Sequence, residues 1–351
     1  MIRSAILVLL LATAGLGLAE RVQLHGAGAT FPYPLYAKYF SVYYKLTGVR
    51  VNYQSIGSGG GVRQLFAQTI HFGATDAPLS DEKMAEFEEK FKTPAVHVPT
   101  ALGAVAVIYN LPGVTEPLKL SGPLLAEIYL GKVRMWNDPK IQAENPELRL
   151  PPLPITVVHR SDGSGTTYIF TEYLSKVSPE WRERVGFGKS VAWPTGLGGK
   201  GNEGVTGLVR QTPGSIGYAE LVYALQNKIP YAALKNRAGK YVLPSLESVK
   251  AAAAIEDFPK DTRVSLTDTP APDGYPISSL TWILVHQDMA KNRAYKSRAQ
   301  AEAMAQLLWW IIHDGQEYNE PLHYARLPEV AVKITEENLR ELRYNGEPLL
   351  R

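Results

Sequence analysis

The sequence contains no cysteine in 351 residues, and this absence excludes several kinds of chemistry. Without cysteine there are no disulfides, no thiol nucleophiles, no zinc–thiolate sites and no iron–sulfur clusters. A large charge of either sign is missing too, because 37 Lys and Arg face 34 Asp and Glu and leave a formal charge of +3. A nucleic-acid-binding chain would show a clear basic surplus, so we expect no nucleic-acid partner.

Long hydrophobic runs are also scarce, and the one that matters lies at the start of the chain. Arg3 precedes this apolar stretch, and the small residues Gly17 and Ala19 end it. This order is typical of a secretory signal peptide over residues 1–19. A membrane anchor is the alternative, but a spanning helix needs roughly 20 apolar residues and this run is shorter.

Export and the lack of cysteine together predict a protein that is not tethered to a membrane. Cleavage after residue 19 would remove Arg3 and leave 36 Lys and Arg against 34 Asp and Glu, a charge of +2. No cysteine stands at the cleavage point, which excludes a lipid-anchored lipoprotein. We therefore expect an exported, soluble monomer.

Short apolar segments alternate with amphipathic ones along the rest of the chain. A 45% hydrophobic and 20% charged composition suits a globular protein. The pattern predicts strands at residues 49–53, 72–75, 104–109, 155–158 and 276–286, and helices that include residues 36–43, 62–68, 81–91, 168–174, 204–209 and 307–312. Such alternation predicts an α/β fold with mainly parallel sheets.

Four segments place glycines and hydroxyl residues directly before a predicted helix. They are residues 26–32, 56–61, 160–167 and 196–202. A helix N-terminus offers unpaired N–H groups and the positive end of its dipole, and glycine lets the backbone come close. For a single segment the alternative is an ordinary helix cap by Thr30, Ser58 or Ser164. Several such segments together favour a small oxyanion ligand.

Two charged positions follow predicted strands, where open α/β sheets bind ligands. Arg160 could form two N–H bonds to an oxyanion, with Asp162 orienting the guanidinium; the alternative is a surface ion pair of little energetic consequence. Asp76 is compatible with an anion only if the ligand carries a proton, because its carboxylate then accepts a hydrogen bond from that O–H group. The alternative is that Asp76 caps the turn at Ala77-Pro78.

Several segments of the sequence match known cofactor-binding or catalytic motifs only in part. Residues 196–201 fit G-x-G-x-x-G and Glu220 lies at a suitable distance, but Trp193-Pro194 interrupts the strand that should precede a dinucleotide-binding loop. Ser58 and Ser164 fail G-x-S-x-G, and the seven histidines include no H-E-x-x-H pair. We therefore predict no catalytic residue, no metal site and no cofactor.

At these residues the sequence resembles the periplasmic phosphate-binding proteins of the bacterial phosphate-specific ABC transport system. The similarity covers nearly the whole chain beyond the predicted signal peptide and thins after about residue 225. The matching runs are GAGATFPYPLYAKYF, VNYQSIGSGGGVRQ, FGATDAPLSDE, IYLGKVRMWNDP, RSDGSGTTYIFTEYL, WPTGLGGKGNEGV and PGSIGYAE.

The resemblance implies a type II periplasmic-binding-protein fold, with two α/β lobes joined by a two-strand hinge. Lobe I would comprise residues 20–98 and 276–351, and lobe II residues 99–275. The protein would bind inorganic phosphate in the periplasm, without catalysis. It would deliver the phosphate to an inner-membrane permease pair driven by a cytoplasmic ATPase.

The resemblance also implies a set of ligand contacts. Asp76 would accept the ligand proton, Arg160 would make the charged contact, and Asp162 would orient that arginine. Hydroxyl and backbone N–H donors would complete the phosphate-binding set, which is Thr30, Phe31, Ser58, Asp76, Arg160, Ser164, Gly165 and Thr166. The fourth glycine segment, residues 196–202, receives no ligand role.

Two alternatives use the same pocket. A secreted phosphoesterase would need a nucleophile with a base, or a two-metal cluster, and the sequence shows neither. A binding protein for another protonated tetrahedral oxyanion, such as arsenate, would satisfy Asp76 equally well.

Overall fold

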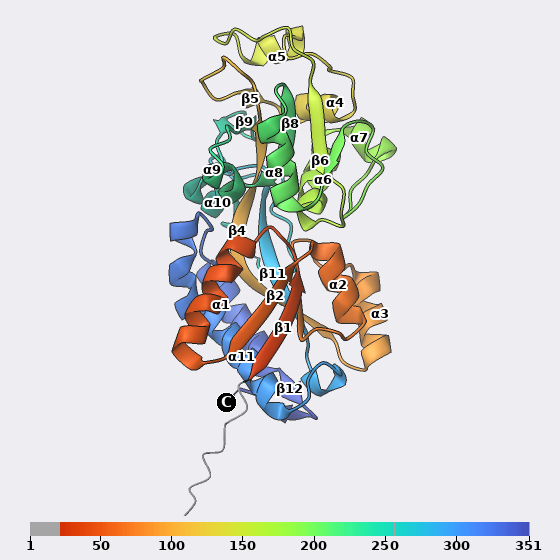
Figure 1. Cartoon of the computed structure of the whole chain (residues 1–351), viewed down its shortest axis with the longest axis vertical. Helices are drawn as coiled ribbons and strands as arrows, with labels where there is room; N and C mark the ends of the chain where they lie inside the picture. Colours follow the sequence, from red (N-terminus) through yellow and green to blue (C-terminus); the bar gives the residue numbers. More distant parts are fainter. Residues whose placement is uncertain (1–21, 256, 351) are drawn as a thin grey trace, which may run out of the picture.

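The computed structural model describes residues 22–255 and 257–350. The signal peptide predicted at residues 1–19 lies outside the described residues. Within the described ranges, no helix is both long and apolar enough to cross a membrane. The chain forms two α/β lobes stacked along the long axis of the molecule (Figure 1), which confirms the predicted fold class.

The first lobe, lower in Figure 1, is built on three parallel strands. Strand β1 pairs with β2 on one side and with β3 on the other. The elements of this lobe are β1 (Gln23–Gly28), α1 (Tyr33–Thr47), β2 (Arg50–Ser55), α2 (Ser58–Phe66), β3 (Phe72–Thr75), α3 (Asp81–Phe91), η1 (Met289–Lys291), α11 (Arg298–Ile312), η2 (Asp314–Tyr318), η3 (Glu320–Leu322), α12 (Glu329–Arg340), β12 (Arg343–Tyr344) and β13 (Glu347–Pro348).

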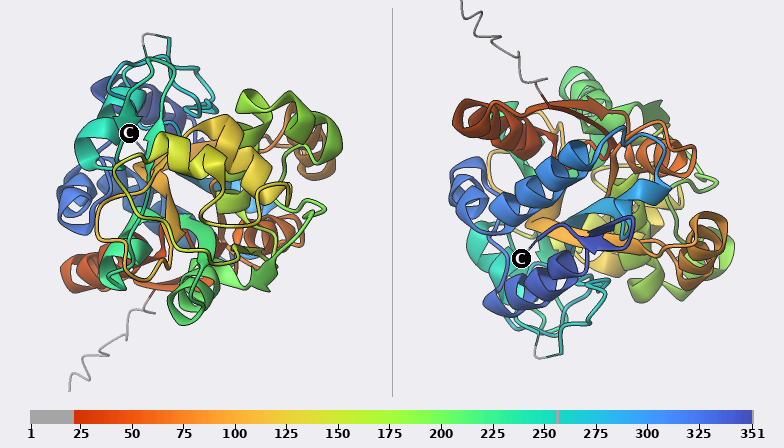
Figure 2. Two further views of the ribbon diagram at one scale, coloured as in Figure 1. Left: turned by 90° about the horizontal axis from the view of Figure 1, so that it is seen from above. Right: turned by 90° about the horizontal axis from the view of Figure 1, so that it is seen from below.

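The second lobe repeats this plan with different strands. Strand β6 is parallel to both β7 and β8, and a small sheet of order β10-β9-β5 packs beside them. Its elements are β5 (Lys119–Leu120), α4 (Gly122–Tyr129), α5 (Pro139–Glu144), β6 (Thr156–Arg160), α6 (Gly165–Val177), α7 (Pro179–Arg184), β7 (Leu197–Gly199), α8 (Gly201–Gln211), β8 (Ser215–Glu220), α9 (Leu221–Gln226), β9 (Ala233–Lys235), β10 (Tyr241–Val242) and α10 (Leu246–Ala252). Figure 2 shows helices around the strands from both ends of the molecule.

Two long strands, β4 (Ala95–Tyr109) and β11 (Ser278–His286), connect the lobes. They pair with each other in antiparallel fashion; β11 also pairs with β3, and the last part of β4 pairs with β8. The result is one eight-stranded sheet of order β2-β1-β3-β11-β4-β8-β6-β7. The prediction of mainly parallel sheets holds within each lobe but is wrong at the centre, because β4 and β11 carry the chain between the lobes in opposite directions.

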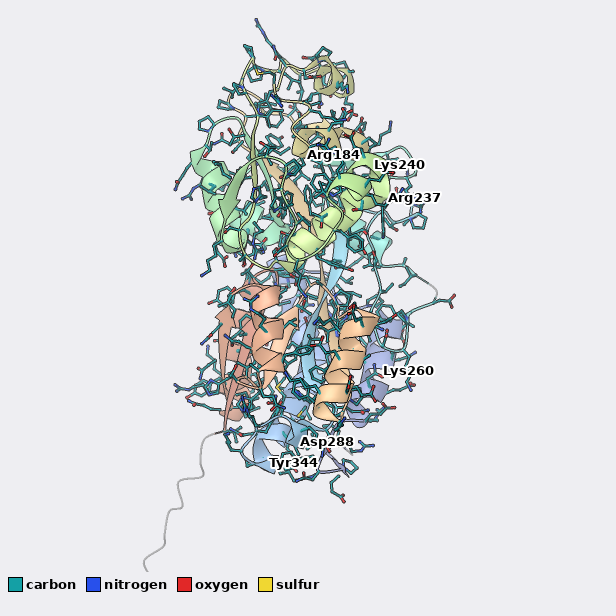
Figure 3. All side chains as sticks on the ribbon, turned by 90° about the vertical axis from the view of Figure 1, so that its right-hand side faces the viewer. Arg184, Arg237, Lys240, Lys260, Asp288 and Tyr344 are labelled. Atoms are coloured by element: carbon teal, nitrogen blue, oxygen red, sulfur yellow. The ribbon has the colours of Figure 1, made fainter. Side chains whose placement is uncertain are left out.

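A third segment, residues 261–267, also contacts both lobes. Arg263 Nη1 donates to Leu79 O at 2.7 Å in the first lobe, and Ser265 Oγ donates to Glu172 Oε2 at 2.7 Å in the second. Figure 3 places Lys260 beside the lower lobe and Arg237 beside the upper one, so the chain returns to the first lobe before β11. The predicted lobe boundaries after residues 98 and 275 stay predictions.

Local sequence explains where the elements begin and end. Helix α3 follows Ser80, whose Oγ accepts a hydrogen bond from Lys83 N at 3.2 Å, and two acidic residues in its first turn favour the helix dipole. Helix α1 ends at Gly48, which has φ +76°. The structure confirms the predicted bounds of β3 and α3, at residues 72–75 and 81–91.

Candidate ligand-binding site

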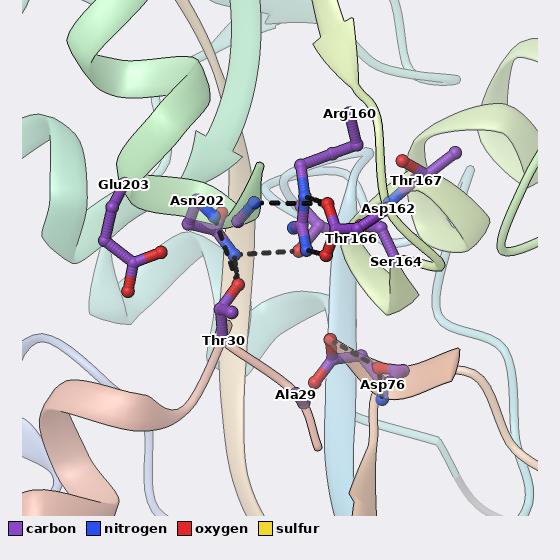
Figure 4. Close-up of polar contacts among 12 residues, drawn as sticks. Ala29, Thr30, Asp76, Arg160, Asp162, Ser164, Thr166, Thr167, Asn202 and Glu203 are labelled. Atoms are coloured by element: carbon purple, nitrogen blue, oxygen red, sulfur yellow. Dashed lines mark hydrogen bonds and ion pairs between the residues drawn. The ribbon is translucent and has the colours of Figure 1, made fainter. Parts of the chain in front are cut away.

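The predicted site residues come together where strand ends of the two lobes face each other (Figure 4). The backbone alone already joins the lobes here, because Gly59 N donates to Gly163 O at 2.9 Å. All eight predicted ligand residues are buried, and Arg160 is the most exposed of their polar members, at 4%. They are Thr30 and Phe31 after β1, Ser58 at the start of α2, Asp76 after β3, Arg160 at the end of β6, and Ser164, Gly165 and Thr166 at the start of α6.

Gly165, the first residue of α6, allows the second lobe to approach the first. A Cβ atom added at this position would lie 2.5 Å from Ser58 Oγ and closer still to Asp76 Oδ2. No larger residue fits there without moving these side chains. The N-terminus of the 13-residue helix α6 therefore lies directly beside Asp76 and Ser58.

This junction also contains backbone donors without acceptors. Within the described residues, the N–H groups of Phe31, Gly165 and Thr166 donate to no backbone oxygen. The first N–H groups of a helix have no partner inside the helix, and they carry the positive end of its dipole. This arrangement suits an anion between the lobes.

Arg160 has a fixed orientation and one uncommitted nitrogen. Its Nε and Nη2 donate to the two carboxylate oxygens of Asp162, each at 2.7 Å, while Nη1 is buried without a partner among the described residues. The side chain of Arg160 is 2% exposed, so the alternative of a surface ion pair is wrong. Burial raises the pKa of Asp162, but the bonds from Arg160 outweigh it and hold that pKa below its usual value.

Asp76 is the only predicted ligand residue with a negative charge, and it lies opposite Arg160. Its Oδ1 accepts a 2.7 Å bond from Thr281 Oγ1, and Ser58 Oγ lies 3.4 Å from Oδ2. Burial raises the pKa of Asp76 to about 7, although Thr281, Arg160 and Ser58 each act to lower it. The alternative of a turn cap is wrong, because Thr75 Oγ1 rather than Asp76 accepts the Ala77 N–H.

The helix-cap alternative holds for only one of the three hydroxyl residues. Ser164 caps α6, since its Oγ accepts a 2.9 Å bond from Thr167 N. Ser58 is the first residue of α2, whose N-cap is Gly57, and Thr30 lies two residues before the Pro32 N-cap of α1. The hydroxyls of Thr30 and Ser58 therefore do not cap the helices that follow them in the sequence.

The sequence analysis missed Asn202, in the fourth glycine segment. Its Nδ2 donates to Thr30 Oγ1 at 2.6 Å in the first lobe and to Thr166 Oγ1 at 3.1 Å in the second (Figure 4). Its neighbour Gly201 donates its N–H to Asp162 Oδ1 at 3.1 Å. The glycine pattern before α8 was the available signal, but sequence alone could not show what this segment faces.

The dinucleotide alternative for residues 196–201 does not fit the structure. Residues Leu197–Gly199 form the edge strand β7 beside β6 instead of a loop that follows a strand. In the described part of the chain, no group of three His, Cys, Asp or Glu side chains could hold a metal ion.

Comparison with protein families gives one match that covers most of the chain. Residues 17–314 match the model of the PBP superfamily domain. Among curated proteins, the phosphate-binding protein PstS of Xylella fastidiosa (strain Temecula1) is 46% identical over 321 residues, which are 90% of this chain and 85% of that protein. The phosphate-binding protein PstS of Pasteurella multocida (strain Pm70) is 45% identical over 334 residues, 94% of this chain and 93% of that protein.

Solved structures with the same fold are more distant in sequence. A high-affinity periplasmic phosphate-binding protein (PfluDING) bound with phosphate has a TM-score of 0.70 at 20% identity, covering 94% of this chain and 100% of that one. The ancestral soluble variant of the human phosphate-binding protein has a TM-score of 0.73 at 19% identity, covering 93% and 99%. These likenesses confirm the predicted type II periplasmic-binding-protein fold. The family model and the extent and identity of the PstS matches show that this chain belongs to the PstS family of phosphate-binding proteins in the PBP superfamily.

Proposed function

We propose that this protein binds inorganic phosphate between its two lobes, outside the cytoplasm, and delivers it to an ABC-type phosphate importer. The observation that carries the proposal is a buried set of hydrogen-bond donors with one carboxylate, Asp76, facing an uncommitted nitrogen of Arg160. Donors alone would accept any small anion. A single acceptor among them selects an anion that still carries a proton.

Each lobe contributes a different part of the proposed contact set. From the first lobe, Thr30 and Ser58 donate their hydroxyls, Phe31 donates its backbone N–H, and Asp76 accepts the proton of the ligand. From the second lobe, Arg160 supplies the positive charge in the orientation fixed by Asp162. The start of α6 completes the set with the hydroxyl and N–H donors of Ser164, Gly165 and Thr166.

The ligand's proton decides between phosphate and sulfate. Phosphate carries at least one O–H group near neutral pH, and Asp76 can accept a hydrogen bond from it. Sulfate carries none, so its oxygen would face the carboxylate lone pairs without a hydrogen between them. Unmatched buried polar groups of this kind can reject a ligand by several powers of ten.

We propose the localisation of the protein, the division into lobes and the transport partners on the same basis. Residues 1–19 would direct export and be removed, leaving a periplasmic monomer without a lipid anchor. Residues 20–98 with 276–351 and residues 99–275 would form the two lobes that close on phosphate by bending at β4 and β11. The partners would be an inner-membrane permease pair and its cytoplasmic ATPase.

Calorimetric titration of the purified protein with phosphate and with arsenate tests this function. We expect one tight site for phosphate; absence of binding would contradict the proposal. Comparable arsenate binding would widen the ligand class to protonated tetrahedral oxyanions. A chromogenic phosphate-ester assay checks the phosphoesterase alternative, and we expect no turnover because the PstS family binds phosphate for transport and is not catalytic.

A further inference from the structure

Asn202 is fully buried, and every polar atom of its side chain has a partner. The amide oxygen accepts a 2.8 Å bond from Glu220 N, which fixes which end of the amide is the oxygen. The amide nitrogen must then face Thr30 and Thr166, and its two hydrogens are committed to their hydroxyl oxygens. No hydrogen of the Asn202 side chain is left for a ligand.

The bonds from Asn202 decide what the Thr30 hydroxyl can do. A hydroxyl oxygen has two acceptor positions and one donor hydrogen. Both acceptor positions of Thr30 Oγ1 are used, by Asn202 Nδ2 at 2.6 Å and by Asn202 N at 3.1 Å. The only remaining function of this hydroxyl is to donate its hydrogen. Thr166 Oγ1 likewise accepts one of its bonds from Asn202.

We propose that Asn202 is the positioning residue of the phosphate site, because it leaves the Thr30 hydroxyl only its donor hydrogen for the ligand and takes one of the two acceptor positions of the Thr166 hydroxyl. This inference rests on the proposed function and goes beyond it by explaining how the ligand is oriented. A hydroxyl whose acceptor positions are filled cannot receive a hydrogen bond from the ligand's O–H group. The protonated oxygen is therefore excluded from this side of the site and directed to Asp76.

The same segment reaches the charged side of the site. Gly201 N donates to Asp162 Oδ1 at 3.1 Å, and Asp162 in turn holds Arg160. Asn202 also joins the lobes, since Thr30 belongs to the first and Thr166 to the second. The start of α8 thus orients donors from both lobes without contacting the ligand itself.

A double-mutant cycle measured by calorimetry with phosphate tests this role. We expect Asn202→Ala to weaken phosphate binding about tenfold, because hydroxyls that are free to turn no longer present their hydrogens. In the background of Thr30→Val we expect a loss below about threefold, because the main hydroxyl that Asn202 orients is gone. Equal losses in both backgrounds, or no loss from Asn202→Ala, would overturn the inference.

Asn202→Asp keeps the size of the side chain and covers the case in which the alanine variant does not fold. Its carboxylate accepts hydrogen bonds where the amide donated them, so Thr30 and Thr166 would turn their hydrogens away from the ligand. We expect a loss larger than that of the alanine variant at about pH 8, shrinking relative to wild type at about pH 5, where a carboxyl that neutralises can donate again. A loss independent of pH would contradict the donor role.

Asn145 provides a matched control. It is a buried asparagine of the second lobe with three side-chain hydrogen bonds to the backbone, at Lys119 N, Lys119 O and Ile141 O. Asn145→Ala should lower the melting temperature and leave phosphate affinity unchanged. If wild type itself does not bind phosphate, the proposed function fails; if wild type binds and the cycle is additive, only the role of Asn202 fails.

Discussion

The two lobes bring opposite charges to one site, and they hold those charges in different ways. In the second lobe, Arg160 is bound through two nitrogens to Asp162, so its charge is fixed and balanced. In the first lobe, the carboxylate of Asp76 accepts hydrogen bonds from the hydroxyls of Thr281 and Ser58, and burial raises its pKa to about 7. The comparison indicates that the second lobe supplies affinity, while the first lobe supplies a selectivity that depends on protonation.

The largest expected effect comes from removing the fixed charge. Arg160→Ala leaves Asp162 without its partner and removes the positive charge of the site. A hydrogen bond to a charged group is worth about 1.5–3 kcal/mol, and the unpaired Asp162 carboxylate would also repel the anion, so we expect phosphate affinity to fall at least about a hundredfold. Arg184→Ala is the control in the same lobe, because among the described residues Arg184 forms an ion pair only with Glu180, and that pair is exposed. A loss below about threefold for Arg160→Ala would assign the affinity to the backbone donors instead.

The lobes should also differ in their resistance to acid. His286 in the first lobe is fully buried between Phe87 and Phe91, and burial lowers its pKa to about 4. A neutral buried histidine contributes stability above about pH 6.5, and this contribution is lost as the pH falls toward 4 because the unfolded chain takes up the proton first. The contribution at stake is about 3 kcal/mol.

His286→Leu removes this proton uptake and should shift acid unfolding to lower pH. Burial also lowers the pKa of two other first-lobe histidines, His71 to about 4 and His97 to about 3. We therefore expect the first lobe to unfold at a higher pH than the second as the solution is acidified. Amide hydrogen exchange, measured separately for each lobe, tests this order. Identical acid-unfolding midpoints for wild type and His286→Leu would count against this assignment.

A smaller effect tests the protonation of Asp76 directly. Sulfate does not change its own charge between about pH 8.5 and about pH 5.5, but Asp76 gains a proton as the pH falls through about 7 and can then donate to an anion. Sulfate affinity should rise at least about tenfold over this range, so that calorimetry detects sulfate binding at about pH 5.5 and none at about pH 8.5. Asp76→Asn should bind sulfate with little dependence on pH. A flat sulfate profile for wild type would mean that the carboxyl does not face the ligand.

The smallest expected effect separates two serines that lie on opposite lobes. Ser164 caps α6, so Ser164→Ala should lower the unfolding free energy by about 1 kcal/mol as well as weaken phosphate binding. Ser58 caps no helix, but its Oγ accepts the N–H of Asp76 at 3.2 Å, so Ser58→Ala should weaken binding and leave that buried N–H without a partner, at a cost of about 1–3 kcal/mol. Thermal unfolding and calorimetry on both variants measure the difference. A smaller destabilisation by Ser58→Ala than by Ser164→Ala would contradict the role of Ser58 as the partner of the Asp76 N–H.

Local signals in the sequence predicted much of this site. The bounds of β3 and α3 agree with the pattern, and Arg160 ends a strand as expected, because these features depend on neighbouring residues. The sequence could not predict that Thr281 donates a hydrogen bond to Asp76, because the two residues are 205 positions apart. The bond between Thr30 and Asn202 spans 172 positions for the same reason. Such contacts follow from how β4 and β11 bring the lobes together, and the glycine pattern does not encode that arrangement.

The proposed selectivity depends on one contact, the hydrogen bond that Asp76 accepts from the O–H group of the ligand. It is tested most directly by titrating the wild-type protein with phosphate and with sulfate, side by side, at about pH 8, where Asp76 is ionised. We expect tight binding of phosphate and no measurable heat with sulfate. Comparable affinities for the two anions would contradict it.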